Sequence, residues 1–436
     1  MHVCRRWRYI VFESPLRLHL RLVCNANTPV TQTLAVWPRA FPIVIEEWRS
    51  RLLLNGVKHI IAALQHHDRV SEIVLYSTTC TLLKRLYKVM TKPYPVLTNL
   101  HLEFEKTSAP VVPGTFLDRS APRLKVLSLI GIPFPALPKR LPFCHQLVKV
   151  HLANIPNTGY ISPEATATAL SALTKLQFVY IGFESPASRP DPTNRPPSSF
   201  TRVVLPALTH LEFHGTSEYF EDLVARIDTP AITYVETWFF NQLDFDIPHF
   251  LHFIRRTQIP GSFGEARLHF VDKCVSIDFC YRDPTGGKEF RTALSIKISC
   301  HALDWQVGCL AQICGKISPF VSNVERLLID TRHSDCGSAT NVLFPDWEDY
   351  VDNPQWLEIF HAFSALQHMR IPRSLGDVIA SALQELTGER VMDALPMLHH
   401  LYLPSSSAST QQAIVPFISS RQRSNHPVTV HFTEMV

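Results

Sequence analysis

The sequence predicts an α/β fold in which a curved parallel sheet is backed by helices. Three observations support this fold class. A short apolar phrase recurs at a nearly regular interval along much of the 436-residue chain. Segments with helical periodicity lie between several of these phrases. Prolines stand one or two residues before several of the phrases, at positions where a fixed φ and a missing amide proton do little harm to a strand.

The recurring phrase is an apolar residue followed three and then five positions later by two more. It returns about ten times, which favours stacked repeats over chance. Its members are Val70, Ile73 and Leu75; Leu97, Leu100 and Leu102; Leu124, Leu127 and Leu129; Leu147, Val150 and Leu152; Leu176, Val179 and Ile181; Leu208, Leu211 and Phe213; Ile232, Val235 and, imperfectly, Thr237; Val324, Leu327 and Ile329; Leu366, Met369 and Ile371; and Leu398, Leu401 and Leu403. This is the LxxLxL core of a leucine-rich repeat, whose last three positions form a short strand.

The spacing of the phrases supports the repeat interpretation. First members at 70, 97, 124, 147, 176, 208 and 232 give intervals of 27, 27, 23, 29, 32 and 24 residues, in or just above the usual range of about 20 to 29. The following gap of 92 residues contains strand-like alternation at 266–270, 275–279 and 294–298, and it has room for two or three degenerate units. The sequence therefore predicts an irregular leucine-rich-repeat-like solenoid.

Helical periodicity predicts the elements that back the sheet. In 218–227, Phe220, Leu223, Val224 and Ile227 form one apolar stripe that would lie against the sheet. The expected helices are 164–173, 218–227, 248–255, 305–317, 355–363 and 375–386. A strand that alternates with a helix at this period is typical of a parallel sheet covered on one side.

Composition limits the compartment and the partners. The net charge of +4 is small for this length and the basic residues are scattered, so nucleic acid is not expected as a partner. Ten cysteines without a CxxC pair, and the absence of an Asn-x-Ser/Thr sequon, indicate a reducing compartment, either cytoplasm or nucleus. No apolar run approaches 18 residues, so no membrane span is expected. Residues 185–199 contain five prolines and are predicted to form a mobile loop.

The amino-terminal residues 3–15 read VCRRWRYIVFESP. This segment resembles the second half of an F-box, in which a helix with the pattern VCRxWR is followed by an apolar stretch and Ser-Pro. The opening of that motif, a Leu-Pro start followed by an apolar helix, would precede Val3. The resemblance implies a short helical remnant of a module that docks a Skp-type adaptor. The residues that would pack in this module or contact the adaptor are Val3, Cys4, Trp7, Ile10 and Val11.

Two further stretches, 17–38 and 205–257, are similar to fungal F-box proteins with a leucine-rich-repeat-like carboxyl region. The implied organisation is a partial F-box and connector in 1–40 and a solenoid in 41–436. The implied function is that of a substrate-receptor subunit of a cullin-RING (Skp-cullin-F-box) ubiquitin ligase, which binds a target protein through the repeat surface. The alternative is a non-catalytic repeat scaffold without adaptor binding.

The first residues permit other interpretations. Five arginines and one acid among the first 21 residues are compatible with a mitochondrial presequence. The segment is poor in serine, contains Trp7 and Pro15, and runs directly into the family-like 17–38, which favours the F-box interpretation. A simple helical cap on the repeat array would use the same apolar residues without any partner.

Strand alternation predicts which side chains face away from the core, namely those that flank the inner apolar positions. This set is rich in histidine and aromatic residues, which tend to carry binding energy at protein interfaces. The predicted target-binding residues are His101, His151, Tyr180, His210, His214, Tyr234, Trp238, Arg326, His368, Arg370, His400 and Tyr402.

No motif in the sequence predicts catalysis, a metal or a cofactor. The adjacent pairs His66 with His67 and His399 with His400 would point to opposite faces of a strand, and no HExxH motif accompanies them. Residues 285–288 read TGGK but lack the first glycine of a phosphate loop, and a turn between two strands explains 283–287 better. We expect a non-catalytic protein.

The predicted strand register makes a first testable prediction. Leu211→Asp should lower the free energy of unfolding by several kcal/mol, on the order of the cost of an unpaired buried charge. His210→Ala should leave stability nearly unchanged, because that side chain faces outward. Thermal or urea unfolding of the two variants checks this, and the reverse order would mean that the register is shifted by one residue.

Overall fold

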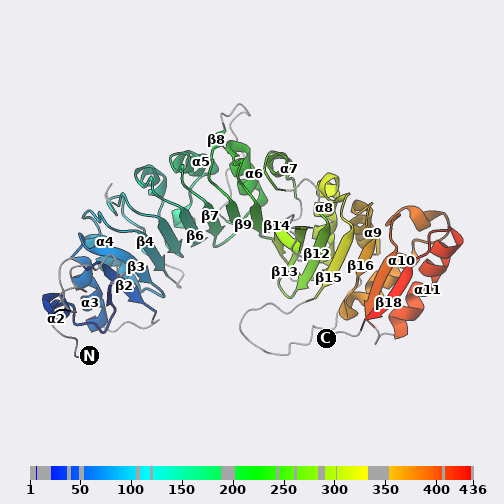
Figure 1. Ribbon diagram of the computed structural model, residues 1–436, viewed down its shortest axis with the longest axis horizontal. Helices are drawn as coiled ribbons and strands as arrows, with labels where there is room; N and C mark the ends of the chain where they lie inside the picture. The colour runs from blue at the N-terminus through cyan, green and yellow to red at the C-terminus, as the bar shows by residue number, and fades with distance from the viewer. Residues whose placement is uncertain are drawn as a thin grey trace. The chain divides into compact units, whose positions relative to one another are not determined.

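The computed structural model describes residues 6, 21–36, 41–48, 54–104, 109–117, 121–187, 202–241, 245–259, 263–282, 290–300, 302–331, 353–404 and 408–433. The chain divides into two compact units, Met1–Ile232 (unit 1) and Thr233–Val436 (unit 2). The protein is α/β, with a large, mostly parallel sheet that is backed by helices and is not closed into a barrel (Figure 1). The predicted fold class is confirmed at this level.

In unit 1, parallel strands follow one another in the order β1-β2-β3-β4-β5-β6-β7-β9. Their bounds are β1 Leu22–Cys24, β2 Ile43–Glu47, β3 Val70–Leu75, β4 Asn99–Glu103, β5 Val126–Ile130, β6 Lys149–Ile155, β7 Phe178–Phe183 and β9 His210–Gly215. A separate parallel pair is formed by β8 (Val203–Val204) and β10 (Ile227–Asp228).

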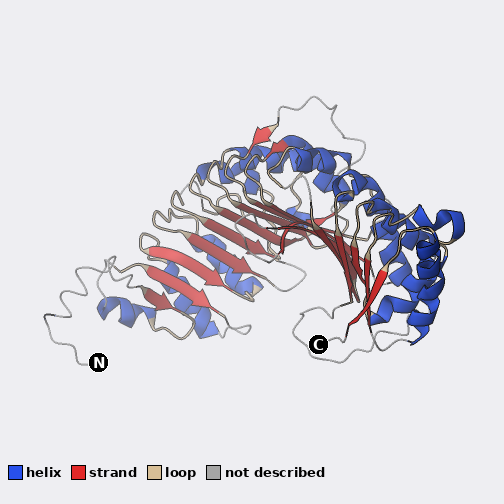
Figure 2. Ribbon diagram, turned by 45° about the vertical axis from the view of Figure 1, so that its right-hand side comes forward, coloured by secondary structure: helices blue, strands red, loops and turns tan. Residues whose placement is uncertain are grey.

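The helices of unit 1 cover one face of its sheet (Figure 2). They are α2 Val30–Val36, α3 Leu54–Leu64, α4 Cys80–Val89, α5 Pro163–Ser171 and α6 Ser217–Arg226, with short 3-10 turns at Leu137–Lys139, Leu141–Phe143 and Asn157–Gly159. Side chains cap the amino-terminal ends of three of these helices: Thr79, Ser162 and Thr216 each accept a hydrogen bond from a backbone amide of the first turn. The face of the sheet opposite the helices is called the open face below.

In unit 2 the strand order is β11-β14-β13-β12-β15-β16-β17-β18. The bounds are β11 Tyr234–Phe239, β12 Glu265–Val271, β13 Cys274–Arg282, β14 Phe290–Ser299, β15 Arg326–Asp330, β16 His368–Arg370, β17 His400–Pro404 and β18 Thr429–Thr433. The helices are α7 Pro248–Arg255, α8 Leu303–Val321, α9 Asn353–Ala362, α10 Gly376–Gln384 and α11 Ala408–Arg423, with 3-10 turns at Arg373–Leu375 and Gly388–Met392. They also lie on one side of their sheet (Figure 2).

Each apolar phrase found in the sequence coincides with one strand. The first member lies just before the strand, or at its first residue in β3, and is fully buried, as Leu97, Leu208 and Leu398 illustrate. The next members point into the core and stack on their neighbours, so that Leu100 pairs with Leu127 and Val179 pairs with Leu211. Leu211 is buried and His210 is exposed, as the predicted register requires.

A second backbone contact fixes the start of each strand. The amide of Thr98 donates to the carbonyl of Ser71 at 2.8 Å, that of Lys125 to Thr98 at 2.8 Å, and that of Val148 to Lys125 at 2.8 Å. The same link recurs in unit 2, where His399 donates to Gln367 at 3.0 Å. Equivalent residues therefore sit side by side before the strands begin, which sets the register of the side chains that follow.

The gap between Ile232 and Val324 differs from the expectation of degenerate repeat units. The three predicted alternating segments do form strands, but β12, β13 and β14 are antiparallel neighbours in one meander. Outer strands β14 and β12 then pair in parallel with β11 and β15. Alternation of apolar and polar residues indicates a strand but does not indicate its direction. This explains why the prediction of degenerate repeat units was wrong here. The chain reverses between β13 and β14 as predicted, although 283–289 lie outside the described residues.

The predicted helices agree with the structure to within a few residues. The segment 248–255 matches α7, and 218–227 matches α6, whose side chains Phe220, Leu223 and Val224 are buried together with Ile227 just after it. The predicted 1–40 domain lies mostly outside the described residues, and β1 within it pairs with β2. Of the Pro-rich stretch 185–199, only 185–187 are described. Among the described helices, none is long and apolar enough to cross a membrane.

Gly131 follows β5 with φ +67°, in the left-handed region that favours glycine. A Cβ atom at this position would collide with the carbonyl oxygen of Phe104. The close approach allows the turns after β4 and β5 to pack on each other.

The side chain of Thr237 is the basis of a testable prediction, because it stands where the phrase of Ile232 and Val235 would have its last apolar residue. It is fully buried beside Ile296 of β14, and its hydroxyl has no hydrogen-bond partner among the residues that the structure describes. Thr237→Val should raise the free energy of unfolding by about 1 kcal/mol, since an unsatisfied buried hydroxyl is removed at nearly constant volume. Urea unfolding measures the change.

Thr216→Val is the matched control for this prediction. The Thr216 side chain is equally buried, but it caps α6 by accepting from the amide of Tyr219 at 3.4 Å. The same substitution should therefore lower the free energy of unfolding by about 1 kcal/mol. Destabilisation by both variants would show that the Thr237 hydroxyl has a partner.

Candidate functional site

The structure places the twelve predicted target-binding residues on strands. Each stands at a position of its strand that is at least partly exposed, and the residue that follows it is buried. Unit 1 contributes His101, His151, Tyr180, His210 and His214, and unit 2 contributes Tyr234, Trp238, Arg326, His368, Arg370, His400 and Tyr402. The predicted adaptor-binding residues Val3, Cys4, Trp7, Ile10 and Val11 lie outside the described residues.

In-register pairing brings residues from distant parts of the chain into one row on the open face of unit 1. His101 of β4 stands beside Ser128 of β5, Ser128 beside His151 of β6, and His151 beside Tyr180 of β7. The row is extended by Tyr76 and Trp48, which follow β3 and β2. We call these six residues the stacked row.

Ring contacts hold the stacked row together. The ring centroids of Trp48 and Tyr76 are 4.3 Å apart, and those of Tyr76 and His101 are 4.5 Å apart. At the other end, His151 lies 4.6 Å from Tyr180. Trp48 is 64% exposed, so the row presents a large apolar side chain to solvent. Such aromatic pairs order their side chains in advance, which lowers the entropy cost of binding.

The centre of the stacked row is a hydrogen-bonded trio. The Ser128 hydroxyl lies 2.9 Å from Nδ1 of His101 and 3.1 Å from Nδ1 of His151. A hydroxyl has one proton, so it donates to one imidazole and accepts from the other. Glu103 Oε2 lies 3.7 Å from His101 Nε2, which favours a proton on that nitrogen. His101 Nδ1 then accepts from Ser128, and His151 Nδ1 donates to it.

Both imidazoles of the trio favour the neutral form. Burial lowers the pKa of His151 to about 4, and the nearby Lys149 and His101 act in the same direction. Burial also lowers the pKa of His101, a shift that Glu103 opposes. The trio therefore offers neutral, hydrogen-bonding rings to a partner at physiological pH.

A serine between two histidines invites comparison with a nucleophilic site. Ser128 is 5% exposed and lies in the middle of β5, whose backbone pairs with β4 on one side and β6 on the other. The amides around the hydroxyl therefore take part in the sheet and are not directed at an oxyanion. The arrangement fits an ordered polar contact in a binding face better than acyl transfer.

Lys149 and Phe178 form a second contact row beside the trio. The ammonium of Lys149 lies 4.3 Å from the centre of the Phe178 ring, and Phe178 stacks toward His210 at 6.4 Å. On the same strand as His210, burial lowers the pKa of His214. An ammonium group and two aromatic rings thus follow one another from β6 to β9.

In unit 2 the open face begins with an ordered tryptophan. Trp238 of β11 donates from Nε1 to the Ser299 hydroxyl of β14 at 2.7 Å. Lys297 lies 6.0 Å from the tryptophan ring and pairs with Glu236 at 2.6 Å, while Tyr234 donates to the same carboxylate. Trp238 is nevertheless 36% exposed.

Ion pairs lie within the antiparallel meander and join it to β15. The buried Glu265 carboxylate contacts Arg267 at 2.7 Å and Arg326 of β15 at 3.6 Å. Asp278 lies 3.4 Å from His269 Nε2 and accepts from Ser295 at 2.6 Å. Burial alone would raise the pKa of Asp278, but these two donors outweigh it and lower the pKa.

The strands β16, β17 and β18 bring three imidazoles together, and we call His368, His400 and His431 the histidine cluster. The rings of His368 and His400 stack at 4.8 Å with an interplanar angle of 12°. His400 Nδ1 lies 3.0 Å from His431 Nε2, which is a hydrogen bond between two rings. Tyr402 stacks on His431 at 4.7 Å.

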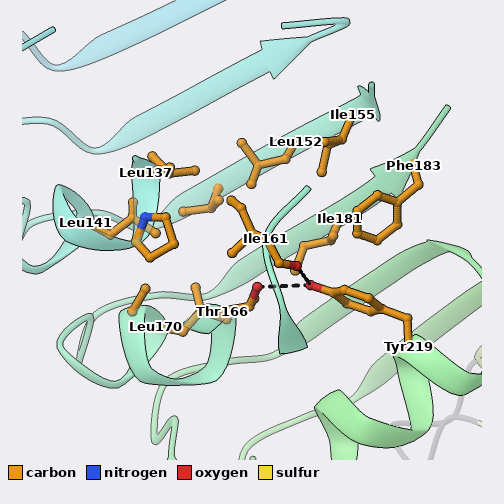
Figure 3. Close-up of a pocket in the computed structure, with 13 residues that line it drawn as sticks. Leu137, Leu141, Leu152, Ile155, Ile161, Thr166, Leu170, Ile181, Phe183 and Tyr219 are labelled. Atoms are coloured by element: carbon orange, nitrogen blue, oxygen red, sulfur yellow. Dashed lines mark hydrogen bonds between the residues drawn. The ribbon is translucent and has the colours of Figure 1, made fainter. Parts of the chain in front are cut away.

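A small cavity lies on the helix-covered side of β6 and β7 (Figure 3). Its volume is about 20 Å³, roughly the space of one water molecule. The lining is apolar except for Thr166 and Tyr219, and the Tyr219 hydroxyl contacts Thr166 Oγ1 at 3.0 Å and donates to the Ile161 carbonyl at 2.9 Å. The polar groups are satisfied, so this cavity is a packing defect and not a ligand site.

Among the described residues, no group of three or more His, Cys, Asp and Glu side chains is arranged to hold a metal ion. The described cysteines are free thiols. Burial raises the pKa of the Cys314 thiol to about 12, which keeps it protonated.

Sequence reasoning missed several residues of the open face. Ser128 stands inside a recognised phrase, and alternation alone would have placed it there. Tyr76 and Trp48 lie just past their strands, where no repeat pattern applies. His431 is on β18, which lacks the phrase, although Val428, Val430 and Phe432 alternate around it.

No protein-family model matches the chain, and a search of curated proteins found no match. The residues of the open face therefore supply the evidence on function.

The lowered pKa of His151 makes a prediction about stability and pH. Below the ordinary imidazole pKa of about 6.5, His151 binds a proton in the unfolded chain and stays neutral in the folded chain. The free energy of unfolding therefore falls as the pH drops from about 6.5 toward about 4. His151→Gln should lose less stability than the parent between about pH 7.5 and pH 5. Urea unfolding at the two pH values measures this difference.

His210→Gln is the control, since this histidine is exposed on the same face. It should show the parent's loss of stability on acidification. If His151→Gln behaved in the same way, His151 would be protonated in the folded protein, and the neutral trio would be wrong.

Proposed function

We propose that this protein is a non-catalytic substrate receptor that holds a target protein on its open face and brings it to a cullin-RING (Skp-cullin-F-box) ubiquitin ligase. One observation carries the receptor role: in each unit, ordered aromatic and imidazole side chains from successive strands, together with guanidinium groups in unit 2, lie on the sheet face that none of the described helices covers. Side chains of these types dominate the energetics of protein interfaces.

The ligase role is supported by the amino-terminal sequence alone. Residues 3–15 resemble the second half of an F-box, and Val3, Cys4, Trp7, Ile10 and Val11 would contact a Skp-type adaptor. The regular parallel strands, each reached through a buried apolar residue, support an irregular leucine-rich-repeat-like solenoid as the target-binding part. Residence in the cytoplasm or nucleus follows from this role.

In this proposal the receptor contributes no chemical group to ubiquitin transfer. Holding the target beside the loaded enzyme raises the effective concentration of its lysines, which accelerates transfer without a catalytic residue in the receptor. The open face suits the task, because a row of preordered rings can bind a polypeptide at low entropy cost. A plain binding scaffold would use the same face, and only adaptor binding separates the two functions.

One experiment tests both halves of the proposal. Tagged parent protein and two variants are expressed, cross-linked and purified, and the adaptor and other captured proteins are quantified. Trp7→Ala should lose the adaptor and keep the other captured proteins. The His151→Ala/Tyr180→Ala double variant should keep the adaptor and lose a defined set of captured proteins by about tenfold, since central interface aromatics each contribute roughly 1 kcal/mol or more.

Trp305→Ala is the matched control, because Trp305 is a half-exposed tryptophan on α8, away from the open face. It should bind both the adaptor and the captured proteins as the parent does. Equal adaptor recovery from the parent and Trp7→Ala would remove the ligase role, and equal capture by the double variant would remove the receptor role. Point variants are preferred to removal of 1–40, since β1 belongs to the sheet.

A further inference from the structure

The β2–β4 end of the stacked row joins aromatic rings and carboxylates in one series of contacts. The indole Nε1 of Trp48 donates a hydrogen bond to the Glu46 carboxylate. Trp48 stacks on Tyr76, whose ring contacts that of His101. At the far side of these rings, His101 Nε2 lies 3.7 Å from Glu103 Oε2. A carboxylate therefore stands at each end of three rings, and we call these five residues the acidic end of the stacked row.

The two carboxylates of the acidic end have no lysine or arginine partner among the described residues. The side chain of Glu46 contacts Trp48, and that of Glu103 contacts His101. Burial lowers the pKa of His101 although Glu103 opposes this shift, so the imidazole is neutral at physiological pH and leaves the carboxylate charge uncompensated. Both glutamate side chains are partly exposed. Their charges are therefore available to a partner.

The basic side chains of this part of the sheet lie at the opposite end of the strands. In β1–β6 or directly before these strands, the described basic residues are Arg21, Arg69, Lys125 and Lys149, all where a strand begins. Arg21 pairs with Glu72 at 2.7 Å, and the Lys149 ammonium lies 4.3 Å from the centre of the Phe178 ring. Those of α3 and α4 belong to the helix-covered side (Figure 2).

The length of the strands separates these cations from the acidic end. A five-residue strand such as β4 is about 13 Å long from first to last residue, which exceeds the Debye length of about 8 Å at physiological ionic strength. Glu46 and Glu103 stand near the ends of β2 and β4, where the strands finish. The described charges around Trp48 and Tyr76 are thus negative and are not balanced by nearby cations.

We propose that the acidic end of the stacked row binds lysine or arginine side chains in a basic segment of a target protein. The inference rests on the proposed function only in assigning a polypeptide to the open face. A cation is attracted to the face of an aromatic ring, most strongly to tryptophan, and Trp48 is 64% exposed. Rings alone would accept an uncharged segment, whereas rings beside two carboxylates without a cationic partner select a positively charged one.

The contacts at Glu46 allow charge and order to be tested separately. Trp48 is held by its hydrogen bond to this side chain and by stacking on Tyr76 at an interplanar angle of 17°. In Glu46→Gln the amide oxygen can still accept from the indole, so the ring stays ordered while the negative charge is lost. Trp48→Leu has the opposite effect, because it removes the ring and keeps both carboxylates.

The test uses the full-length chain and fluorescein-labelled octalysine, with binding followed by fluorescence polarisation at pH 7.5 and constant ionic strength. The parent should bind octalysine in preference to octaglutamate and to octalysine with acetylated side chains, which is uncharged. Glu46→Gln and Glu103→Gln should each weaken binding by about two- to fivefold. Trp48→Leu should weaken it by a similar factor, although no charge changes, and Trp48→Phe should weaken it less.

Glu164→Gln and Trp305→Leu are the matched controls. Glu164 is an exposed carboxylate of the same unit on the helix α5, and Trp305 is a half-exposed tryptophan on α8. Both variants should bind octalysine as the parent does. Equal affinity of the parent, Trp48→Leu and Glu46→Gln would overturn the inference. So would octaglutamate or acetylated octalysine that bound as tightly as octalysine, or a loss in Glu164→Gln as large as that in Glu46→Gln.

Arg49 and Arg51 follow Trp48 in the sequence and compete as occupants from the chain itself. If octalysine bound only to Arg49→Gln/Arg51→Gln, the acidic end would serve this chain and the inference would be wrong. Failure of the proposed function is distinguishable, since it is read from adaptor recovery and from capture that depends on His151 and Tyr180. A chain that captured proteins in this way but did not bind octalysine would keep the proposed function and lose this inference.

Discussion

In-register pairing of neighbouring strands is the constraint on which the rest of this structure depends. The amide before one strand binds the carbonyl before the previous strand, as Lys125 does to Thr98, so each strand starts at the same level. Leucines then stack behind the sheet and the intervening side chains stack in front of it. A shift of one residue in a single strand would put a leucine on the open face and a histidine in the core.

The same register places side chains from neighbouring strands in rows on the open face, where they contact one another. Ser128 forms hydrogen bonds with His101 and His151, because the three strands place these residues side by side. The burial that results keeps the imidazole rings neutral. On β17 and β18, His400 lies diagonally across from His431, since its register partner is Thr429, and the two rings form a hydrogen bond with each other. Imidazoles thus have different hydrogen-bond partners in the two units, and the side chains on the adjacent strands decide which.

Much of the fold was readable from the sequence, because LxxLxL phrases and helical stripes are local patterns. Strand direction was not, since the alternation at 275–279 fits either orientation and only the meander makes β13 antiparallel. Alternation also placed the twelve predicted face residues on partly exposed strand positions. The contacts that give the face its chemistry join residues 23 to 31 positions apart, as in Ser128–His151 and His400–His431, and require the register of the completed sheet.

The meander β12–β14 also bears on how unit 2 folds. Its strands are joined by short connections and can pair without waiting for a crossover helix, whereas β15–β18 gain partners only after long loops have closed. The meander is therefore the part of unit 2 whose pairing depends least on loop closure, and it offers one edge to β11 and the other to β15. Where the repeat is interrupted, the strands of this unit thus pair through contacts that are close in sequence, whereas the histidine-bearing strands depend on partners that are distant in sequence.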